Sequence, residues 1–382
     1  SLLISNDAGT GTLSSASNNT GLGHEVFDDL TTGDQNTGVG SLALTKLTTG
    51  GNNTGIGTVA LTALTTGSSN TAVGDNSLAA NTTASNNTAI GASALLSNTT
   101  GLNNVSVGVN SLDANTTGNN NVAIGINSLS ANTTAEANTA VGTNALMVNT
   151  TGTQNVAVGQ GALDANTTGS SLTAVGYNAG SENTTAANTT VIGHNAGDAI
   201  TTGNNNVAVG SNSLSATSTG SENVAIGTSA LASNTTASFN TAIGGAALDA
   251  NTTGSGNVVV GYNAGGALTT GGSNTVVGTN ALITQTTVAS NTAIGNGAME
   301  ANTIGDKAVA VGAGAMAANT TAVHNTAIGY FALVSNTTGG NNTAVGKGAL
   351  DANTTGTVNT AVGVDALGSN TGSGEANTAV GA

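Results

Sequence analysis

Short runs of β-branched and small residues that end in glycine recur along the chain at a fixed spacing. Two examples are 155–159, which reads Asn-Val-Ala-Val-Gly, and 257–261, which reads Asn-Val-Val-Val-Gly. The closing glycines step by 17 residues from Gly23 to Gly363, and one step of 18 leads to Gly381. β-Branched residues favour strands, whereas the Gly, Asn and Thr that fill the rest of each unit are poor helix formers. The pattern therefore predicts one short strand per unit and argues against helices.

We number each unit from its closing glycine, which is column 0. Asn stands at −4, Thr or Val at −3, Ala at −2 and Val or Ile at −1. A small residue follows at +3, Leu at +4, Asn at +7, Thr at +8 and +9, and Gly or Ala at +10. Many such units with almost no insertions are typical of a β-solenoid, in which each unit is one coil and neighbouring coils pair as parallel strands.

We therefore predict an all-β protein, a parallel β-solenoid (β-roll) with one 17-residue repeat per coil and about 21 coils. Residues 23–381 form the continuous solenoid in this prediction, and residues 1–22 form a degenerate first coil. Asn6 stands where the pattern requires a glycine. The additional residue of the last step is placed in the turn Ser373–Ala376.

Substitutions within each column indicate which way its side chains point. Column −1 is Val or Ile nearly throughout and column +4 is mostly Leu, so both are predicted to line the core. Column +7 is Asn in most coils but Leu or Ile in others, as at Leu30, Ile200 and Leu268, so its Asn side chains are predicted to form a buried ladder. The Asn-Thr-Thr triplets at this column match the N-glycosylation pattern, but ladder and turn chemistry is the preferred interpretation. Column +1 varies freely and is predicted to be exposed.

Composition narrows the classes of function. The 382 residues include 57 Gly, no Pro, Cys or Trp, 2% aromatic and 5% charged residues, and the net charge is −15. The three cations are all Lys, which argues against binding to nucleic acid. Without Cys there is no thiolate metal site and no cysteine nucleophile. No apolar run is long enough to predict insertion into a membrane.

No constellation of residues predicts catalysis. Five acidic residues share column +5: Asp113, Asp164, Asp249, Glu300 and Asp351. The closest of them are three coils apart, too far for a catalytic pair of carboxylates. The histidines His24, His194 and His324 lie many coils apart, which argues against a triad or a metal site within one chain.

The densest acidic group lies near the N-terminus and is interpreted as solubilising charge. It consists of Glu25, Asp28, Asp29 and Asp34. We therefore predict a protein that is not an enzyme and has no catalytic residues, no cofactor and no metal ion. An enzyme would instead cleave a polysaccharide, which a panel of glycans would reveal.

Each coil offers few aliphatic side chains to a core. We therefore expect further burial against other copies of the chain, where the small residues of columns −2, 0 and +3 allow close approach. The candidates for contact with another molecule are the rare aromatics: Tyr177, Tyr262, Tyr330, Phe239 and Phe331. An aromatic ring among small side chains is a platform on which a sugar can stack.

The unit Asn-Thr-Ala-Val-Gly-x-x-Ala-Leu-x-x-Asn-Thr-Thr-Gly resembles a repeat of phage tail fibres and large bacterial surface proteins. The half-unit 121–125, Asn-Val-Ala-Ile-Gly, is similar to the head repeats of trimeric autotransporter adhesins. The resemblance covers essentially the whole chain and implies a left-handed parallel β-roll that assembles as a homotrimer. The period of 17 is longer than that of the usual adhesin head repeat, which implies a different cross-section. No chaperone domain, anchor or neck motif is present, so we expect a fragment or a mature cleaved product.

These features predict a structural fibre or shaft, extracellular on a virion tail or a cell surface, as in a phage tail fibre or an adhesin. It would present a face for host attachment to a surface glycan or protein. Two alternatives stay open. Ice-binding β-solenoids use flat Thr arrays, but these usually need Thr-x-Thr, whereas the Thr residues at +8 and +9 are adjacent. A subunit of a polymerising extracellular filament is the other alternative, because both ends stop mid-pattern without evident caps.

Overall fold

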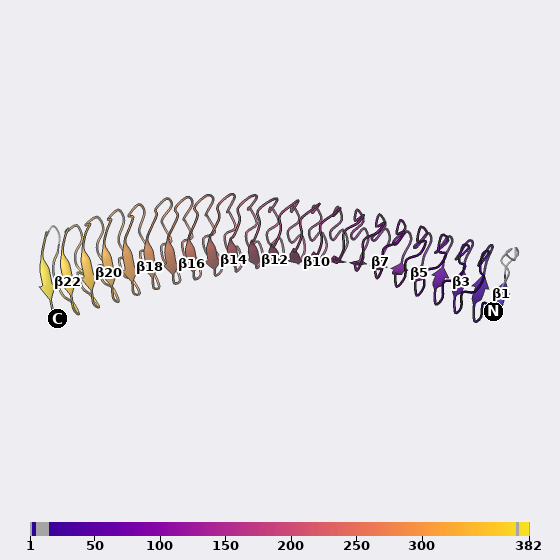
Figure 1. The fold of residues 1–382 in the computed structure, drawn as a ribbon. Helices are drawn as coiled ribbons and strands as arrows, with labels where there is room; N and C mark the ends of the chain where they lie inside the picture. Colours follow the sequence, from indigo (N-terminus) through magenta and orange to yellow (C-terminus); the bar gives the residue numbers. More distant parts are fainter. Residues whose placement is uncertain (1, 5–14, 372–373, 382) are drawn as a thin grey trace. The chain divides into compact units, whose positions relative to one another are not determined.

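A computed structural model describes residues 2–4, 15–371 and 374–381 of the chain. They divide into two units, Ser1–Asn188 and Thr189–Ala382. In both units the described residues form three-residue strands joined by turns, and none of them is helical (Figure 1). The strands of the first unit are β1 (Leu2–Ile4), β2 (Thr20–Leu22), β3 (Thr37–Val39), β4 (Thr54–Ile56), β5 (Thr71–Val73), β6 (Thr88–Ile90), β7 (Val105–Val107), β8 (Val122–Ile124), β9 (Thr139–Val141), β10 (Val156–Val158) and β11 (Thr173–Val175). The strands of the second unit are β12 (Thr190–Ile192), β13 (Val207–Val209), β14 (Val224–Ile226), β15 (Thr241–Ile243), β16 (Val258–Val260), β17 (Thr275–Val277), β18 (Thr292–Ile294), β19 (Val309–Val311), β20 (Thr326–Ile328), β21 (Thr343–Val345), β22 (Thr360–Val362) and β23 (Thr378–Val380).

Within each unit, successive strands pair in parallel at a step of 17 residues. Val156 of β10, for example, lies opposite Thr139 of β9 on one side and Thr173 of β11 on the other. Each 17-residue repeat is therefore one coil, and together the two units contain about 21 turns. The predicted all-β parallel solenoid is confirmed at this level.

Two steps are longer by one residue. Strand β1 pairs with β2 so that Leu2 lies opposite Thr20, and β22 pairs with β23 so that Thr360 lies opposite Thr378. Asn6, which the sequence placed at column 0, lies outside the described residues.

The additional residue of the last coil can be placed from its hydrogen bonds. The side chain of Asn359 donates to the carbonyl of Gly374, 15 residues further on, where other coils span 14. The Asn370 N–H still bonds normally to the carbonyl of Leu367. The additional residue therefore lies between Asn370 and Gly374. Ser373, the first residue of the predicted turn, lies outside the described residues.

Column 0 has a backbone that only glycine adopts readily. Gly108 has a φ of 136°, and a Cβ there would lie 2.5 Å from the carbonyl oxygen of Gly125 in the next coil. An L-residue would be strained by this φ and would also collide with the backbone of the neighbouring coil. The recurring glycine therefore fixes a corner at which successive coils approach closely.

The interior of each coil is lined by columns −4, −2, +3, +4, +7 and +10. In the coil of Gly74, the side chains of Asn70, Ala72, Leu78 and Asn81 are fully buried. Leu78 has a φ of 50°, which costs a Leu about 1–2 kcal/mol. Burial of its side chain contributes about 1.5–3 kcal/mol, which offsets that cost.

Substitutions inside the coil compensate one another in volume. Val191 replaces the usual Ala at −2, and the same coil has Gly197 in place of Leu at +4. A Cβ on Gly197 would lie 2.6 Å from Cγ1 of Val191 and 2.8 Å from Cδ1 of Ile200. Conversely, Gly38 at −2 makes room for Cγ1 of Val26 and for the large ring of Phe27. The core is thus filled to a nearly constant cross-section, as close packing requires.

The prediction that column −1 lines the core is wrong. In β10 the outer residues Val156 and Val158 are 37% and 36% exposed, whereas Ala157 between them is fully buried. Successive side chains of a strand point to opposite faces, so −3 and −1 face outward when −2 faces inward. Columns −2 and +3, which we expected to bring copies of the chain together, are instead filled by buried residues of the coil interior. The predictions for +4 and +7 are confirmed by buried Leu and Asn, and column +1 is exposed at Tyr262.

Two adjacent glycines test the role of column 0. We expect Gly244→Ala to lower the free energy of unfolding by roughly 3 kcal/mol or more, because its φ is 133° and its Cβ would lie 2.5 Å from the carbonyl oxygen of Gly261. Gly245→Ala is the matched control, since its Cβ would meet only the Tyr262 ring at 3.5 Å. Chemical denaturation monitored by circular dichroism measures both. Equal effects of the two changes would contradict the steric account.

Candidate functional site

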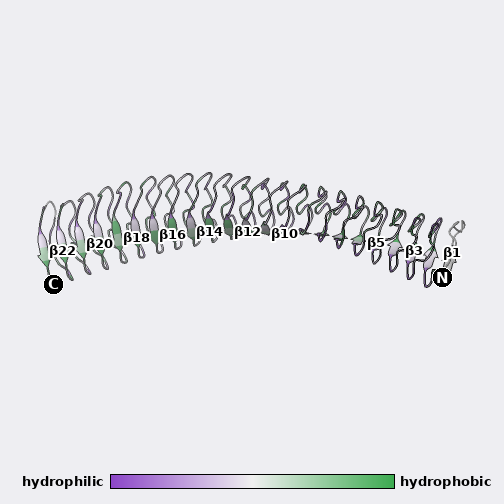
Figure 2. Ribbon diagram, in the orientation of Figure 1, coloured by the Kyte–Doolittle hydropathy of each residue, from purple (hydrophilic) through white to green (hydrophobic). Residues whose placement is uncertain are grey.

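The most extended outward-facing feature of each unit is the strand face, which we define as the side chains of columns −3 and −1. Across β2–β23, column −3 holds only Thr or Val, and column −1 holds only Val, Ile or Leu. Figure 2 shows the hydrophobic colour concentrated on the strand arrows. No charged residue occurs in either column of these strands. Column −1 is apolar in every one of these strands, and soluble proteins rarely leave a long apolar stripe uncovered, so the strand face is a candidate contact surface.

The Asn-Thr-Thr triplets belong to a buried ladder, as the sequence predicted. The side-chain nitrogen of Asn115 donates to Oδ1 of Asn98 at 2.8 Å and to the carbonyl of Gly118 at 3.0 Å. Both Asn side chains are fully buried. Glycosylation requires an accessible side-chain nitrogen, so these asparagines serve the packing of the coil and not the attachment of glycans.

The two threonines after each such Asn have different surroundings. The Thr150 hydroxyl at column +8 donates to the carbonyl of Thr167 in the next coil at 3.0 Å. Thr151 at column +9 is exposed. Only the second threonine of this pair is therefore exposed to solvent. The two adjacent threonines do not place both of their hydroxyl groups on one exposed face.

The acidic residues of column +5 stay on separate coils. Burial raises the pKa of Asp113, Asp164 and Asp249, because desolvation disfavours a carboxylate, while hydrogen bonds from backbone N–H groups partly oppose the shift. The buried Oδ1 of Asp113 has no hydrogen-bond partner among the described residues. Since these aspartates lie at least three coils apart, they do not form a carboxylate pair for acid–base catalysis.

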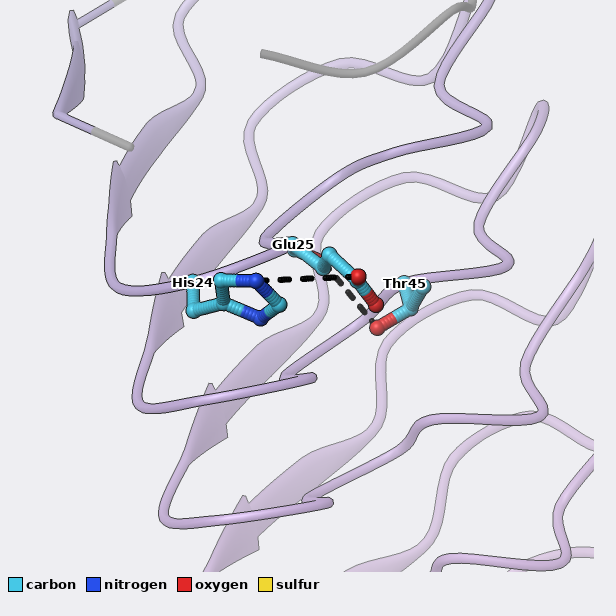
Figure 3. A network of polar contacts seen from close by, with 3 residues as sticks. All are labelled: His24, Glu25 and Thr45. Carbon is cyan, nitrogen blue, oxygen red and sulfur yellow. Dashed lines mark hydrogen bonds and ion pairs between the residues drawn. The ribbon is translucent and has the colours of Figure 1, made fainter. Parts of the chain in front are cut away.

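Two members of the acidic group near the N-terminus, Glu25 and Asp34, make local polar contacts, and Asp34 accepts hydrogen bonds from the backbone N–H and the hydroxyl of Ser17. Figure 3 shows Glu25 beside His24, with Nε2 of His24 at 3.7 Å from Oε1 of Glu25, and Thr45 donating to the Glu25 carbonyl at 3.0 Å. An exposed ion pair of this kind contributes little stability. Within residues 2–4, 15–371 and 374–381, no group of three or more His, Asp or Glu is arranged to hold a metal ion. Nor does this described part include a helix with the length and apolar character needed to cross a bilayer.

The five aromatics singled out in the sequence are all exposed. They are Tyr177, Phe239, Tyr262, Tyr330 and Phe331. Tyr330 and Phe331 come together, with ring centroids 4.1 Å apart and planes tilted by 40°. Tyr262 instead lies beside Gly245 of the preceding coil. The structure thus offers two kinds of candidate contact surface, the repeated strand face and the local aromatic positions.

Comparison with known proteins gives no family. No model of a known protein family matches the chain, and no curated protein matches its sequence. The functional argument therefore depends on the surfaces described above.

The half-buried aspartates Asp113, Asp164 and Asp249 predict a pH dependence of stability. Their pKa in the folded chain lies above the unfolded value of 3.8, so the folded chain is stabilised as the pH falls through the folded pKa, and the gain is complete below 3.8. We expect Asp164→Asn to raise the melting temperature at pH 7 and to lose this advantage near pH 3. Thermal melts across this pH range measure the effect, with exposed Asp29→Asn as the control. A benefit of Asp164→Asn that is independent of pH would contradict the assignment.

Proposed function

We propose that the chain is a structural fibre or shaft without enzymatic activity, and that it assembles with copies of itself through the strand face. The observation that carries this proposal is the absence of charge from columns −3 and −1 of β2–β23 in a chain with a net charge of −15. The acidic residues occupy other columns, such as Asp75 at +1 and Asp164 at +5. A solvated face would accept charge as those columns do, whereas a face covered by another chain excludes it.

The strand face suits a copy of the same chain better than an unrelated partner. Its columns repeat every coil in constant register, as in β13–β15, where Val207, Val224 and Thr241 lie opposite one another. A second copy carries the same repeat and therefore matches the face along many coils. Closed symmetric assemblies are the commonest outcome for such self-association. The assembly we propose is a left-handed homotrimer, on the basis of the resemblance to trimeric adhesin heads.

The proposed location and role follow from the same resemblance. The shaft would stand outside the cell, on a virion tail or a cell surface, and would present its outward columns to a host surface glycan or protein. The exposed column +1 supports this role, because it varies from coil to coil while the interior columns stay nearly constant. A surface whose side chains vary on a fixed scaffold is suited to recognition.

A second candidate function, ice binding, is favoured by one observation. The strand face places Thr at −3 and Val or Ile at −1 on the same side of many strands, as in Thr292 and Ile294 of β18. In this Thr-x-Val/Ile array both side chains of a strand point to one face, unlike the adjacent threonines considered from the sequence. Ice binding requires the strand face to be open to water, whereas self-assembly requires it to be covered. The two functions therefore predict different assembly states.

One charge on the strand face tests the proposal. We expect the wild-type chain to have three times its chain mass of 36.0 kDa in analytical ultracentrifugation, and Val158→Lys to dissociate this assembly. Gln160→Lys is the matched control, because it adds the same charge two residues away at exposed column +1. Circular dichroism verifies that both variants retain the fold.

A wild-type chain that sediments as a monomer would contradict the proposed assembly. Thermal hysteresis and shaped ice crystals in that sample would then support ice binding. An assembly that both Lys variants leave intact would show that the copies meet through another surface.

A further inference from the structure

One outward position in the second unit combines aromatic rings, glycines and a carboxylate. Tyr330 and Phe331 occupy columns +1 and +2 of one coil, whereas Tyr177, Phe239 and Tyr262 stand on coils of their own. Tyr330 and Phe331 are 50% and 41% exposed, and their ring centroids lie 4.1 Å apart. The two rings thus pack against each other and together form an aromatic surface that is partly open to solvent.

Glycines on both sides of Phe331 in column +2 make room for this surface. Gly314 precedes Phe331 by one coil, and a Cβ on Gly314 would overlap Cδ1 and Cε1 of the Phe331 ring. The ring therefore lies directly over the backbone of the preceding coil. Gly348 follows Phe331 by one coil, and a Cβ on Gly348 would overlap Oδ1 of Asp365. A carboxylate oxygen therefore lies over Gly348 in the same way.

The aromatic surface and the carboxylate are close enough to contact one ligand. Successive coils are stacked here through hydrogen bonds from Gly348 N–H to the Tyr330 carbonyl at 3.0 Å and from Asp365 N–H to the Lys347 carbonyl at 2.8 Å. Gly314, under the ring, and Gly348, under the carboxylate, are two coils apart in one column, which corresponds to about 10 Å. A chain of two or three sugar rings bridges such a distance.

The chemistry of the position matches a neutral sugar. The C–H face of a pyranose packs on aromatic rings, and its hydroxyl groups donate hydrogen bonds to a carboxylate. Asp365 and the chain's net charge of −15 repel anionic glycans, and Lys347 is the one cation in the neighbouring coil at column +1.

We propose that Tyr330, Phe331 and Asp365 form a binding site for a neutral oligosaccharide of pyranose sugars. This inference rests on the proposed function of a shaft that presents a surface to a host, and it names the chemical class of the ligand. Phe331 provides the main stacking surface, Tyr330 extends it and contributes a hydroxyl, and Asp365 accepts hydrogen bonds from sugar hydroxyls.

A glycan array tests the proposal with the full chain. The array carries neutral oligosaccharides, such as maltotriose, cellotriose and chitotriose, together with sialylated and sulfated glycans. We expect retention of one or more neutral glycans, and about tenfold weaker binding by Phe331→Asn in a titration with the retained glycan. Asn is chosen because column +2 already holds Asn with a similar φ in other coils, for example 56° at Asn76 against 54° at Phe331. Phe331→Asn therefore removes the ring without requiring a different backbone conformation.

Two further comparisons distinguish a loss of binding caused by displacement of the Phe331 ring from a loss caused by a general effect on the fold. Gly314→Ala retains both rings but displaces Phe331, so it should weaken binding, whereas Gly161→Ala is the control at the same column, with a φ of 66° against 64° at Gly314. Tyr262→Thr removes an exposed tyrosine at column +1 from a coil without a second ring and should leave binding unchanged. Melting curves of all variants show that they are folded.

Several outcomes would overturn the proposal. They are the absence of any retained neutral glycan, a preference for the sialylated or sulfated glycans, and binding that Phe331→Asn does not weaken. Sedimentation of the same samples measures their assembly state, so the test of the sugar site is separate from the test of the proposed assembly. An assembled chain without glycan binding removes the sugar site alone, and a monomer that binds a neutral glycan through Phe331 removes the proposed assembly alone.

Discussion

The buried asparagine amides are the interaction on which the rest of the structure depends. At column −4, Oδ1 of Asn36 accepts the backbone N–H of Asn53 at 2.9 Å, and Nδ2 of Asn53 donates to the carbonyl of Gly67 at 2.9 Å. Column +7 repeats this pattern with its own ladder. A buried amide left without a partner costs about 1–3 kcal/mol, and here the amides find partners in the neighbouring coils, as Asn53 does at Asn36 and Asn70. The 17-residue period is therefore a condition for satisfying the interior, and it explains why the chain has so few insertions.

The same ladders determine what the surface looks like. Because amides, alanines and one leucine fill the interior, the β-branched residues of each strand face outward. This is the reverse of a sheet that packs its Val and Ile against a core. The strand face is uniform along each unit, so it is suited to contact with another repeating surface. The positions that vary, such as Tyr330 and Phe331 at columns +1 and +2, are suited to recognition of a discrete ligand.

The sequence predicted the coil but not all of its faces. The spacing of the glycines and the β-branched residues before them predict the strands. The replacement of Asn by Leu at +7 in some coils predicts one of the two buried ladders. Column −1 was misread because Val and Ile indicate a strand without indicating which face is buried. Leu172, which replaces Asn at −4 and is buried, was the available signal for the second ladder. The approach of Phe331 to Gly314 depends on a left-handed backbone at Phe331, which a sequence pattern alone does not specify.

Deletion of a whole coil tests the central claim most directly. Removal of residues 120–136 takes out 17 residues but leaves every column in register, so the shortened chain should melt within a few degrees of the full chain. Removal of Ala123 alone deletes one residue but shortens a coil to 16 and reverses the alternation within β8. We predict that the loss of one residue lowers the melting temperature far more than the loss of seventeen. A larger effect of the 17-residue deletion, or equal effects of the two, would contradict an interior held together by amide ladders in strict register.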